Sequence, residues 1–474
     1  MALLTVEDAK AAFNLFCCVY GIGTLGMPGN FARAGPLCGA VALAFMGVAN
    51  VYASVVVSKV MLRAPASVQT FADVGGWALG RHGRVAVILS QMGVCLFVPC
   101  AFLVLGGSLL DTVIPDAFSP RNWTIIMAIT ILPVTLVPTL KEGAGAALAG
   151  CLGTIVADFL ALGVLVYYLE DSAGAIPSPS ITFDSIASTF GNLSLAYGAA
   201  IVIPDLQRQH SDPTRMPRVV FATLLLISVL FIAIAVTGYA MVGCQIPGNL
   251  LFAVSGNALG FSAPRGPVVL AFLAMQLHIT IGFSVLLHPA FYYAERAALG
   301  LHRPRPRLLS EATTTDDDEA SGARDYPQDT ALVASTDDDE KAGVTPLADD
   351  EDEGGRFAAC CALRTAMVAG LTLASVVLHD HFHDLVDLVG ASSVSLSCII
   401  LPILSYLCVF AQEVPWYERA YCYLVMGVCG VLSVYVTAKS ARAMVAPVDA
   451  AVVFPFCPAN YQHFAYTNVT HYGS

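Results

Sequence analysis

Two ionisable residues near the middle of long apolar stretches are candidates for chemistry. Asp158 lies in the stretch 146–168, and His278 lies in the stretch 267–294. An ionisable side chain inside such a stretch is a functional candidate by default. Burial favours the protonated form of a carboxyl group, so Asp158 is a candidate for binding and releasing a proton. A hydrogen-bonded structural acid is the alternative.

Two hydroxyl residues follow His278 at the spacing of one helix face. Thr280 and Ser284 are four residues apart, so their side chains share a side of the predicted helix. With His278 they form a candidate site for a coupling proton or cation. The alternative is a packed histidine with two hydroxyls bonded to their own helix.

Three alternate histidines, His379, His381 and His383, form a second candidate cluster. Alternate side chains of an extended segment project to one side, and imidazole with neighbouring carboxylates suits zinc. A membrane oxygenase or desaturase would need several such clusters, and the sequence contains one. We therefore expect no metal site here, and a pH-sensitive gate is the alternative.

Glycine and proline interrupt two apolar stretches in the same way. The interrupting residues are Gly21, Gly23, Gly26 and Pro28 in the first stretch and Gly191, Gly198 and Pro204 in the sixth. Backbone groups freed by such residues cannot face lipid, so they must be buried or line a cavity. Paired interruptions in corresponding positions of two halves predict the binding site of a transporter.

The interrupted backbone suits a zwitterion. A half-helix beginning near Thr24 offers N–H groups and a positive dipole end to a carboxylate. A half-helix ending near Gly21 leaves carbonyl groups for an ammonium group or a metal cation. The predicted substrate-binding residues are Gly21, Ile22, Gly23 and Thr24, with Tyr197 and Gly198 shaping the side-chain pocket. For Tyr197, ordinary packing is an equal alternative.

The composition requires a membrane around these elements. Of the 474 residues, 57% are hydrophobic and 12% are charged, and the mean hydropathy is +0.71. About 20 apolar residues span a bilayer as a helix. We therefore predict an all-α integral membrane protein with eleven passes, at 9–32, 36–60, 85–110, 122–140, 146–168, 185–205, 218–242, 267–294, 357–378, 386–409 and 419–438.

The net charge of −12 is concentrated in one segment. Residues 301–356 hold sixteen acidic and six basic residues, a net charge of −10. Their composition predicts a disordered linker, with a regulatory or trafficking segment as the alternative. The predicted organisation is helices 1–8 in residues 1–300, the insert at 301–356, helices 9–11 in residues 357–440, and a tail at 441–474.

The basic residues predict the orientation. With the N-terminus in the cytosol, 18 of them fall on the cytosolic side and 5 on the other, or 12 and 5 without the insert. The tail is then outside or luminal, in a plasma membrane or a vacuolar or lysosomal membrane. The glycosylation acceptors Asn122 and Asn468 lie on that outer side. Cys244 and Cys457 lie there too, as a disulfide or as free thiols. We expect no cleavable signal sequence, because the first pass itself directs insertion.

Several motifs follow one another in order along the chain. They are Gly21-x-Gly23-x-Leu25-x-x-Pro28 with Phe31 and Gly35, Asp73-Val74-Gly75 with Gly80-Arg81-His82-Gly83-Arg84, Ile203-Pro204-Asp205-Leu206-Gln207 with Asp212-Pro213-Thr214-Arg215, Gly238-Tyr239 with Gly248-Asn249-Leu250-Leu251, and Asp387-Leu388-Val389-Gly390-Ala391 with Leu401-Pro402-Ile403-Leu404-Ser405-Tyr406. This series resembles the amino acid/auxin permease family, also called the amino acid transporter, transmembrane domain family. The resemblance implies a LeuT-like fold, a 5+5 inverted repeat with broken helices 1 and 6 plus one extra helix. It also implies transport of amino acids driven by protons or sodium.

One departure from the family pattern bears on the coupling ion. Sodium-coupled members tend to carry asparagine where this sequence has Cys17, four residues before Gly21. Loss of that side-chain oxygen favours H⁺ over Na⁺.

The sequence therefore predicts a secondary active amino acid transporter, a proton-coupled symporter that alternates access around a site between helices 1 and 6. The expected partners are a small-molecule amino acid and membrane lipid, with no cofactor and no nucleic acid. One alternative is an amino-acid sensor whose acidic insert binds a cytosolic partner. A metal-dependent membrane enzyme is a further alternative, and we do not expect an enzyme.

Overall fold

Helices make up the regular structure of this chain wherever the computed structural model describes it, at residues 5–136, 143–169, 178–255, 259, 263–301, 350–445 and 454–463. The α-helices are α1 (Val6–Val19), α2 (Met27–Ala34), α3 (Pro36–Arg63), α4 (Phe71–Val113), α5 (Pro120–Leu136), α6 (Gly143–Leu169), α7 (Phe183–Ala196), α8 (Ile203–Arg208), α9 (Met216–Val242), α10 (Leu250–Val254), α11 (Arg265–Leu299), α12 (Asp350–Val377), α13 (Phe382–Val389), α14 (Leu401–Val409) and α15 (Trp416–Ala443). Short 3-10 turns are η1 (Ile22–Gly26), η3 (Ala200–Val202), η4 (Pro213–Arg215), η5 (Gly243–Gln245), η6 (His379–His381) and η9 (Ala459–Tyr461), and π-helical turns are η7 (Gly390–Val394) and η8 (Leu396–Ile400). The predicted all-α class is confirmed.

The described residues account for most of the predicted membrane passes. Among the described residues, nine helices are long and apolar enough to cross a membrane, and the bent pair α1 and η1–α2 makes a tenth. The predicted pass at 122–140 corresponds to α5, whose 17 residues end at Leu136, where the described chain stops until residue 143. The count of eleven and the inverted repeat therefore stay predictions.

The first predicted interruption is present as a bend. Helix α1 ends at Val19, and α2 begins at Met27 with Pro28 in its first turn. Proline is tolerated there because the first N–H groups of a helix have no helical partner. The two halves differ in direction by 50°.

The second interruption follows the same logic. Helix α7 ends at Ala196, and α8 begins at Ile203 with Pro204 in its first turn. The intervening backbone contains Tyr197 and Gly198 and one turn of 3-10 helix. Both breaks that the sequence predicted are therefore confirmed.

A cluster of polar contacts joins elements far apart in the sequence around the end of α2. Arg33 of α2 forms an ion pair with Asp387 of α13 at 2.7 Å, and both side chains are 8% exposed. Its guanidinium also donates to the carbonyl of Ser188 in α7 and lies 5.4 Å from the ring of Phe456. Asn30 donates to the Asn192 side chain at 2.9 Å, which ties α2 to α7 again.

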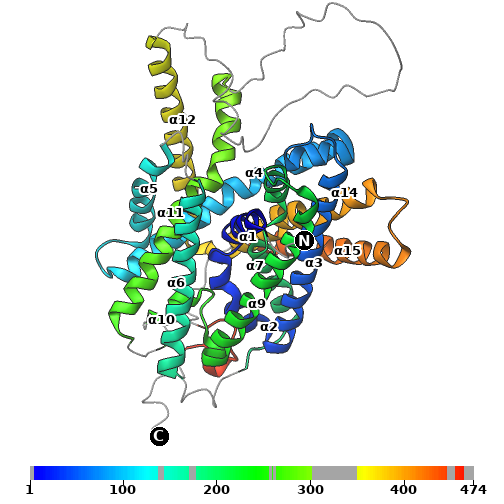
Figure 1. Cartoon of the computed structure of the whole chain (residues 1–474). Helices are drawn as coiled ribbons and strands as arrows, with labels where there is room; N and C mark the ends of the chain where they lie inside the picture. The colour runs from blue at the N-terminus through cyan, green and yellow to red at the C-terminus, as the bar shows by residue number, and fades with distance from the viewer. Residues whose placement is uncertain are drawn as a thin grey trace, which may run out of the picture.

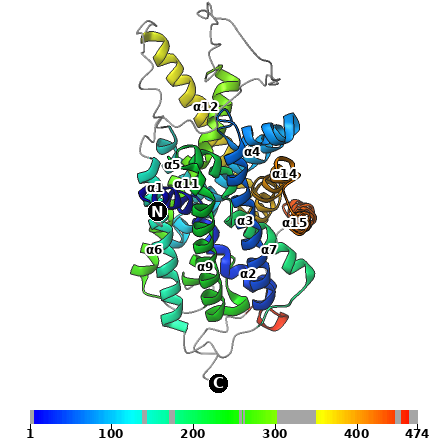
Figure 2. The ribbon, with the colours of Figure 1, turned by 45° about the vertical axis from the view of Figure 1, so that its right-hand side comes forward.

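The described part of the C-terminal tail lies over this cluster. Cys457 forms a disulfide with Cys244 of η5, so the pairing that the sequence left open is present. The Gln245 side chain also donates to the Tyr461 carbonyl. In Figures 1 and 2 this tail segment, drawn in red, lies at the opposite end of the molecule from the start of α12.

The acidic insert is described only at its end. Helix α12 begins at Asp350, so its first seven residues belong to the predicted insert at 301–356. Residues 302–349 and the acceptor Asn468 lie outside the described residues. The acceptor Asn122 is exposed in the first turn of α5.

Candidate functional site

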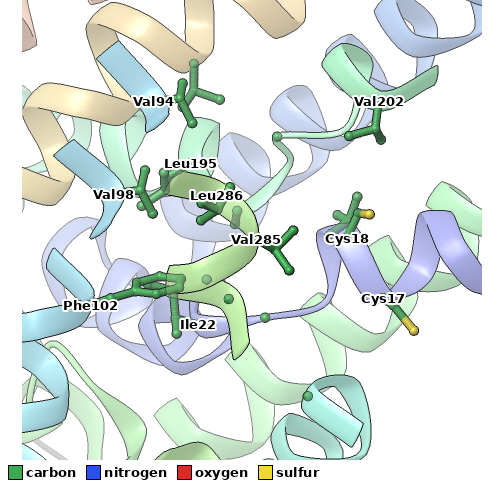
Figure 3. Close-up of a pocket in the computed structure, with 18 of the residues that line it drawn as sticks. Cys17, Cys18, Ile22, Val94, Val98, Phe102, Leu195, Val202, Val285 and Leu286 are labelled. Atoms are coloured by element: carbon green, nitrogen blue, oxygen red, sulfur yellow. The ribbon is translucent and has the colours of Figure 1, made fainter. Parts of the chain in front are cut away.

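A cavity of about 220 Å³ lies where the two broken helices meet α4 and α11. Apolar side chains from α4, α7 and α11 form much of its wall, namely Val94, Val98, Phe102, Leu195, Val285 and Leu286, as Figure 3 shows. No aspartate, glutamate, lysine or arginine lines it in the described part of the chain. The cavity therefore suits a ligand with an apolar portion, and its polar contacts must come from backbone and a few uncharged side chains.

The interrupted backbone reaches this cavity from both helices. Gly21, Ile22 and Gly23 line it from the first break, and Gly198 lines it from the second. The end of α1 contributes Cys17 and Cys18, whose side chains point to different sides of the helix (Figure 3). Four of the six predicted substrate-binding residues thus meet at one cavity.

The fifth predicted residue, Thr24, lies in the turn η1 of the first break, does not line the cavity, and contacts two oxygens. Its hydroxyl lies 2.9 Å from the Gly21 carbonyl oxygen and 3.1 Å from Oδ1 of Asp158. Thr24 is fully buried, and Asp158 is 1% exposed. The structure thus brings the predicted proton site next to the first break, a proximity that the sequence did not reveal.

The surroundings of Asp158 are otherwise sparse. The Tyr20 phenol interacts with this carboxyl group, while Oδ2 has no partner with hydrogen-bond geometry in the described residues. A buried carboxyl group that is only partly hydrogen-bonded needs an explanation beyond packing, because an unsatisfied buried polar atom costs free energy.

The sixth predicted residue, Tyr197, does not contribute its side chain to the cavity. Its fully buried hydroxyl donates to Ser228 of α9 at 2.9 Å, and its ring packs edge-on against Phe231. The break turns the Tyr197 side chain toward α9, so in this structure it packs there and does not form a wall of the cavity.

The predicted cation residues on α11 separate into two groups. His278 is buried and lines the cavity, and its Nδ1 lies 3.1 Å from the Gly150 carbonyl oxygen of α6. Thr280 donates instead to the carbonyl of Gln276 in its own helix, and neither it nor Ser284 lines the cavity. A helix presents residues 278 and 280 on different faces, so these three side chains do not form one site.

The three histidines of the second cluster also separate. They lie in a 3-10 turn and the start of α13 rather than in an extended segment. His379 contacts Asp380, His381 contacts Asp384, and His383 packs against Gly248. Across the residues the structure describes, no group of three or more histidine, cysteine or acidic side chains is arranged to hold a metal ion.

Glycine at position 23 is required by the contact between the two breaks. A Cβ atom there would lie 2.7 Å from the Ala196 backbone. We expect Gly23→Val to force the broken helices apart and to reduce substrate uptake at least about 100-fold. Displacing binding groups by about 1 Å has effects of this size. Uptake by purified protein in liposomes measures this.

Gly163→Ala is the matched control, since no atom lies within 4 Å of the added Cβ. Both variants should show the same elution profile in detergent. Normal uptake by Gly23→Val would contradict the assignment of the breaks as the site.

A model of the family described as transmembrane amino acid transporter protein matches residues 8–443. Amino acid transporter AVT3B of Arabidopsis thaliana is 24% identical over 439 residues, covering 87% of each chain. Amino acid transporter AVT1D of the same plant is 26% identical over 48% of this chain, and vacuolar amino acid transporter 3 of Schizosaccharomyces pombe is 23% identical over 51%. The chain spans 42% of AVT1D and 37% of the fission yeast protein.

A solved structure shares the fold. The crystal structure of MhsT in complex with L-phenylalanine superposes with a TM-score of 0.57 at 11% identity, covering 91% of this chain and 98% of that chain. Because the family model matches far more than half of the sequence, this chain belongs to the transmembrane amino acid transporter family.

Proposed function

We propose that this protein transports amino acids across a membrane by alternating access to the cavity between the two breaks. The observation that carries the proposal is that Gly21, Ile22, Gly23 and Gly198, from helices that are broken in the same way, line one cavity in a member of a transporter family. That family consists of transporters and not of enzymes, which argues against the enzyme alternative.

The cavity favours amino acids with uncharged, apolar side chains. Helix ends leave N–H groups and carbonyl groups without helical partners, and those near Gly21 and Gly23 suit a carboxylate and an ammonium group. The side chain of the substrate would then contact the walls formed by Val98, Phe102 and Val285. A charged substrate side chain would be buried there without an opposite charge, at a high cost in free energy.

The contacts of Thr24 supply a route for proton coupling. Its hydroxyl carries one hydrogen but faces two oxygens, on Gly21 and Asp158. When Asp158 is protonated, its own hydrogen can point to the Thr24 oxygen, and Thr24 donates to the Gly21 carbonyl. When Asp158 is ionised, Thr24 must donate to the carboxylate instead, because an unpaired buried charge is costly. The proton thereby changes the hydrogen bonding of the substrate-binding backbone.

Ion pairs at the two ends of the first membrane pass could hold the two sides of the cavity closed in turn. Asp8 of α1 pairs with Arg215 of η4 at 2.6 Å, and Arg33 of α2 pairs with Asp387 of α13 at 2.7 Å. Each pair joins one half of the broken helix to another part of the protein. We infer that the two pairs separate in turn as each side of the cavity opens.

The Cys244–Cys457 disulfide supports the predicted orientation. Disulfides persist in oxidising compartments and are rare in the cytosol, which supports a tail on the exterior or luminal side. With the predicted eleven passes, the N-terminus would then face the cytosol. Enzymatic removal of glycans from Asn468 or Asn122 should lower the mass of the protein. This test applies whether the protein resides in the plasma membrane or in the vacuolar or lysosomal membrane. The predicted orientation would be contradicted if neither asparagine carried a glycan and a tag on the C-terminal tail could be labelled only from the cytosolic side.

The transport proposal is tested with purified protein in liposomes. An inward acidic gradient should drive uptake of radiolabelled apolar amino acids such as leucine, and a sodium gradient without a pH gradient should not. Absence of gradient-dependent uptake for every amino acid would overturn the proposal. Uptake that follows sodium alone would overturn the choice of ion and leave the transport activity standing.

A further inference from the structure

His278 lies at the wall of the cavity between two other elements. Its side chain extends from α11, contacts Gly150 of α6, and lies against Gly21 at the first break. The ring of Phe102 from α4 packs beside it with centroids 6.3 Å apart. These neighbours fix the ring at a point where a substrate in the cavity would meet it.

The contact with Gly150 determines which ring nitrogen carries hydrogen. Nδ1 lies 3.1 Å from the Gly150 carbonyl oxygen, and a carbonyl oxygen only accepts hydrogen bonds. Nδ1 therefore donates. In a neutral imidazole the other nitrogen, Nε2, then has a lone pair and accepts.

Nε2 points to the first break. A Cβ atom added to Gly21 would lie 2.9 Å from Nε2, so glycine at position 21 leaves this side of the ring open. No residue that the structure describes makes a hydrogen bond with Nε2. An acceptor is thus presented to the cavity next to the carbonyl end of α1.

The cavity needs such an acceptor for an amino acid. No aspartate or glutamate lines it in the described residues, so an ammonium group entering it meets no carboxylate. Its three N–H groups require acceptors, and carbonyl groups at the end of α1 without helical partners would supply the others.

We propose that His278 is a substrate-binding residue whose Nε2 accepts a hydrogen bond from the α-ammonium group of the amino acid. The proposal rests on the proposed transport function. It assigns His278 to recognition of the substrate rather than to a site with Thr280 and Ser284 for the coupling ion. The protein would therefore reject carboxylic acids that lack the amino group.

Two substitutions separate this role from simple packing. His278→Asn keeps a donor near the Nδ1 position for the Gly150 carbonyl and loses the acceptor at the Nε2 position. His278→Gln keeps an acceptor near Nε2 and loses the donor near Nδ1. A purely structural role predicts that asparagine is tolerated and glutamine is not, and substrate recognition predicts the reverse.

The experiment measures uptake of radiolabelled leucine into liposomes and its inhibition by 4-methylpentanoate, which is leucine without its amino group. We expect His278→Asn to raise the KM for leucine about 10- to 100-fold, the effect of one hydrogen bond to a charged group. The inhibition constant of 4-methylpentanoate should not change, so discrimination between the two compounds should fall by the same factor. His278→Gln should retain most of the discrimination.

The outcomes distinguish this proposal from the transport proposal. Wild-type uptake with unchanged discrimination in His278→Asn would overturn the role of His278 and leave the transport function standing. No uptake of any amino acid by the wild-type protein would overturn both. Gly163→Ala on the adjoining helix α6 controls for effects of substitution alone, because its added methyl group meets no atom within 4 Å.

Discussion

Replacing Asp158 by asparagine is expected to abolish accumulation of substrate driven by a pH gradient while preserving exchange of substrate across the membrane. The asparagine amide can donate to Thr24 as the protonated carboxyl group does, but it cannot release a proton. The Thr24 hydroxyl then stays on the Gly21 carbonyl, 2.9 Å away in the structure. A gradient of two pH units supports up to about 100-fold accumulation for one proton per substrate, and this variant should show none.

The measurement compares net uptake with counterflow in the same liposomes. Counterflow needs no driving ion, so it reports binding and movement of the protein alone. Thr24→Val, which removes the hydroxyl between the carboxyl group and the Gly21 carbonyl, should lose accumulation in the same way, and Thr24→Ser should retain it. Concentrative uptake by Asp158→Asn at the wild-type level would exclude Asp158 as the proton site.

Replacing Asp387 by asparagine is expected to destabilise the closed arrangement of α2, α7 and α13. It leaves the guanidinium of Arg33 buried without an opposite charge. Breaking a buried ion pair by removing one partner costs about 3–5 kcal/mol. Both side chains are only 8% exposed, so solvent offers little compensation. The thermal unfolding temperature of the purified protein should fall, and uptake should fall with it.

The double variant Arg33→Met with Asp387→Leu separates the charge from the packing. Apolar residues of similar volume often replace a buried ion pair without loss of stability. The double variant should therefore recover the unfolding temperature. If Asp387→Asn and the double variant unfold at the same temperature as the wild type, the pair does not hold this end of the molecule closed.

The positions of the two breaks were predictable from local sequence. Pro28 and Pro204 each stand in the first turn of a half-helix, and the glycines before them end the preceding helix. Backbone conformation depends mainly on a residue and its neighbours, so glycine and proline show where a membrane helix is interrupted. Asp158 was also identifiable, because an acidic residue within an apolar stretch stands out without knowledge of its contacts.

The direction of side chains at the breaks was not predictable. Tyr197 follows α7 directly, yet its hydroxyl reaches Ser228 on α9 and leaves the cavity to smaller neighbours. Helical periodicity does not continue through an interruption, so it cannot assign a face to residues inside one. Thr280 and Ser284 follow His278 closely in the sequence, but residues 278 and 280 lie on different faces of α11, and only His278 reaches the cavity.

The sequence alone determined the class of protein, the location of most membrane helices and the two places where helices break, since these depend on composition and local backbone preference. The tertiary structure decided which groups act together. It paired Arg33 with Asp387 across 354 positions of the chain, brought Thr24 to Asp158 across 134, and joined Cys244 to Cys457. It also set the hydrogen on Nδ1 of His278 through a carbonyl group of another helix. Such contacts depend on how helices pack in three dimensions, and a single sequence carries no local signal of them.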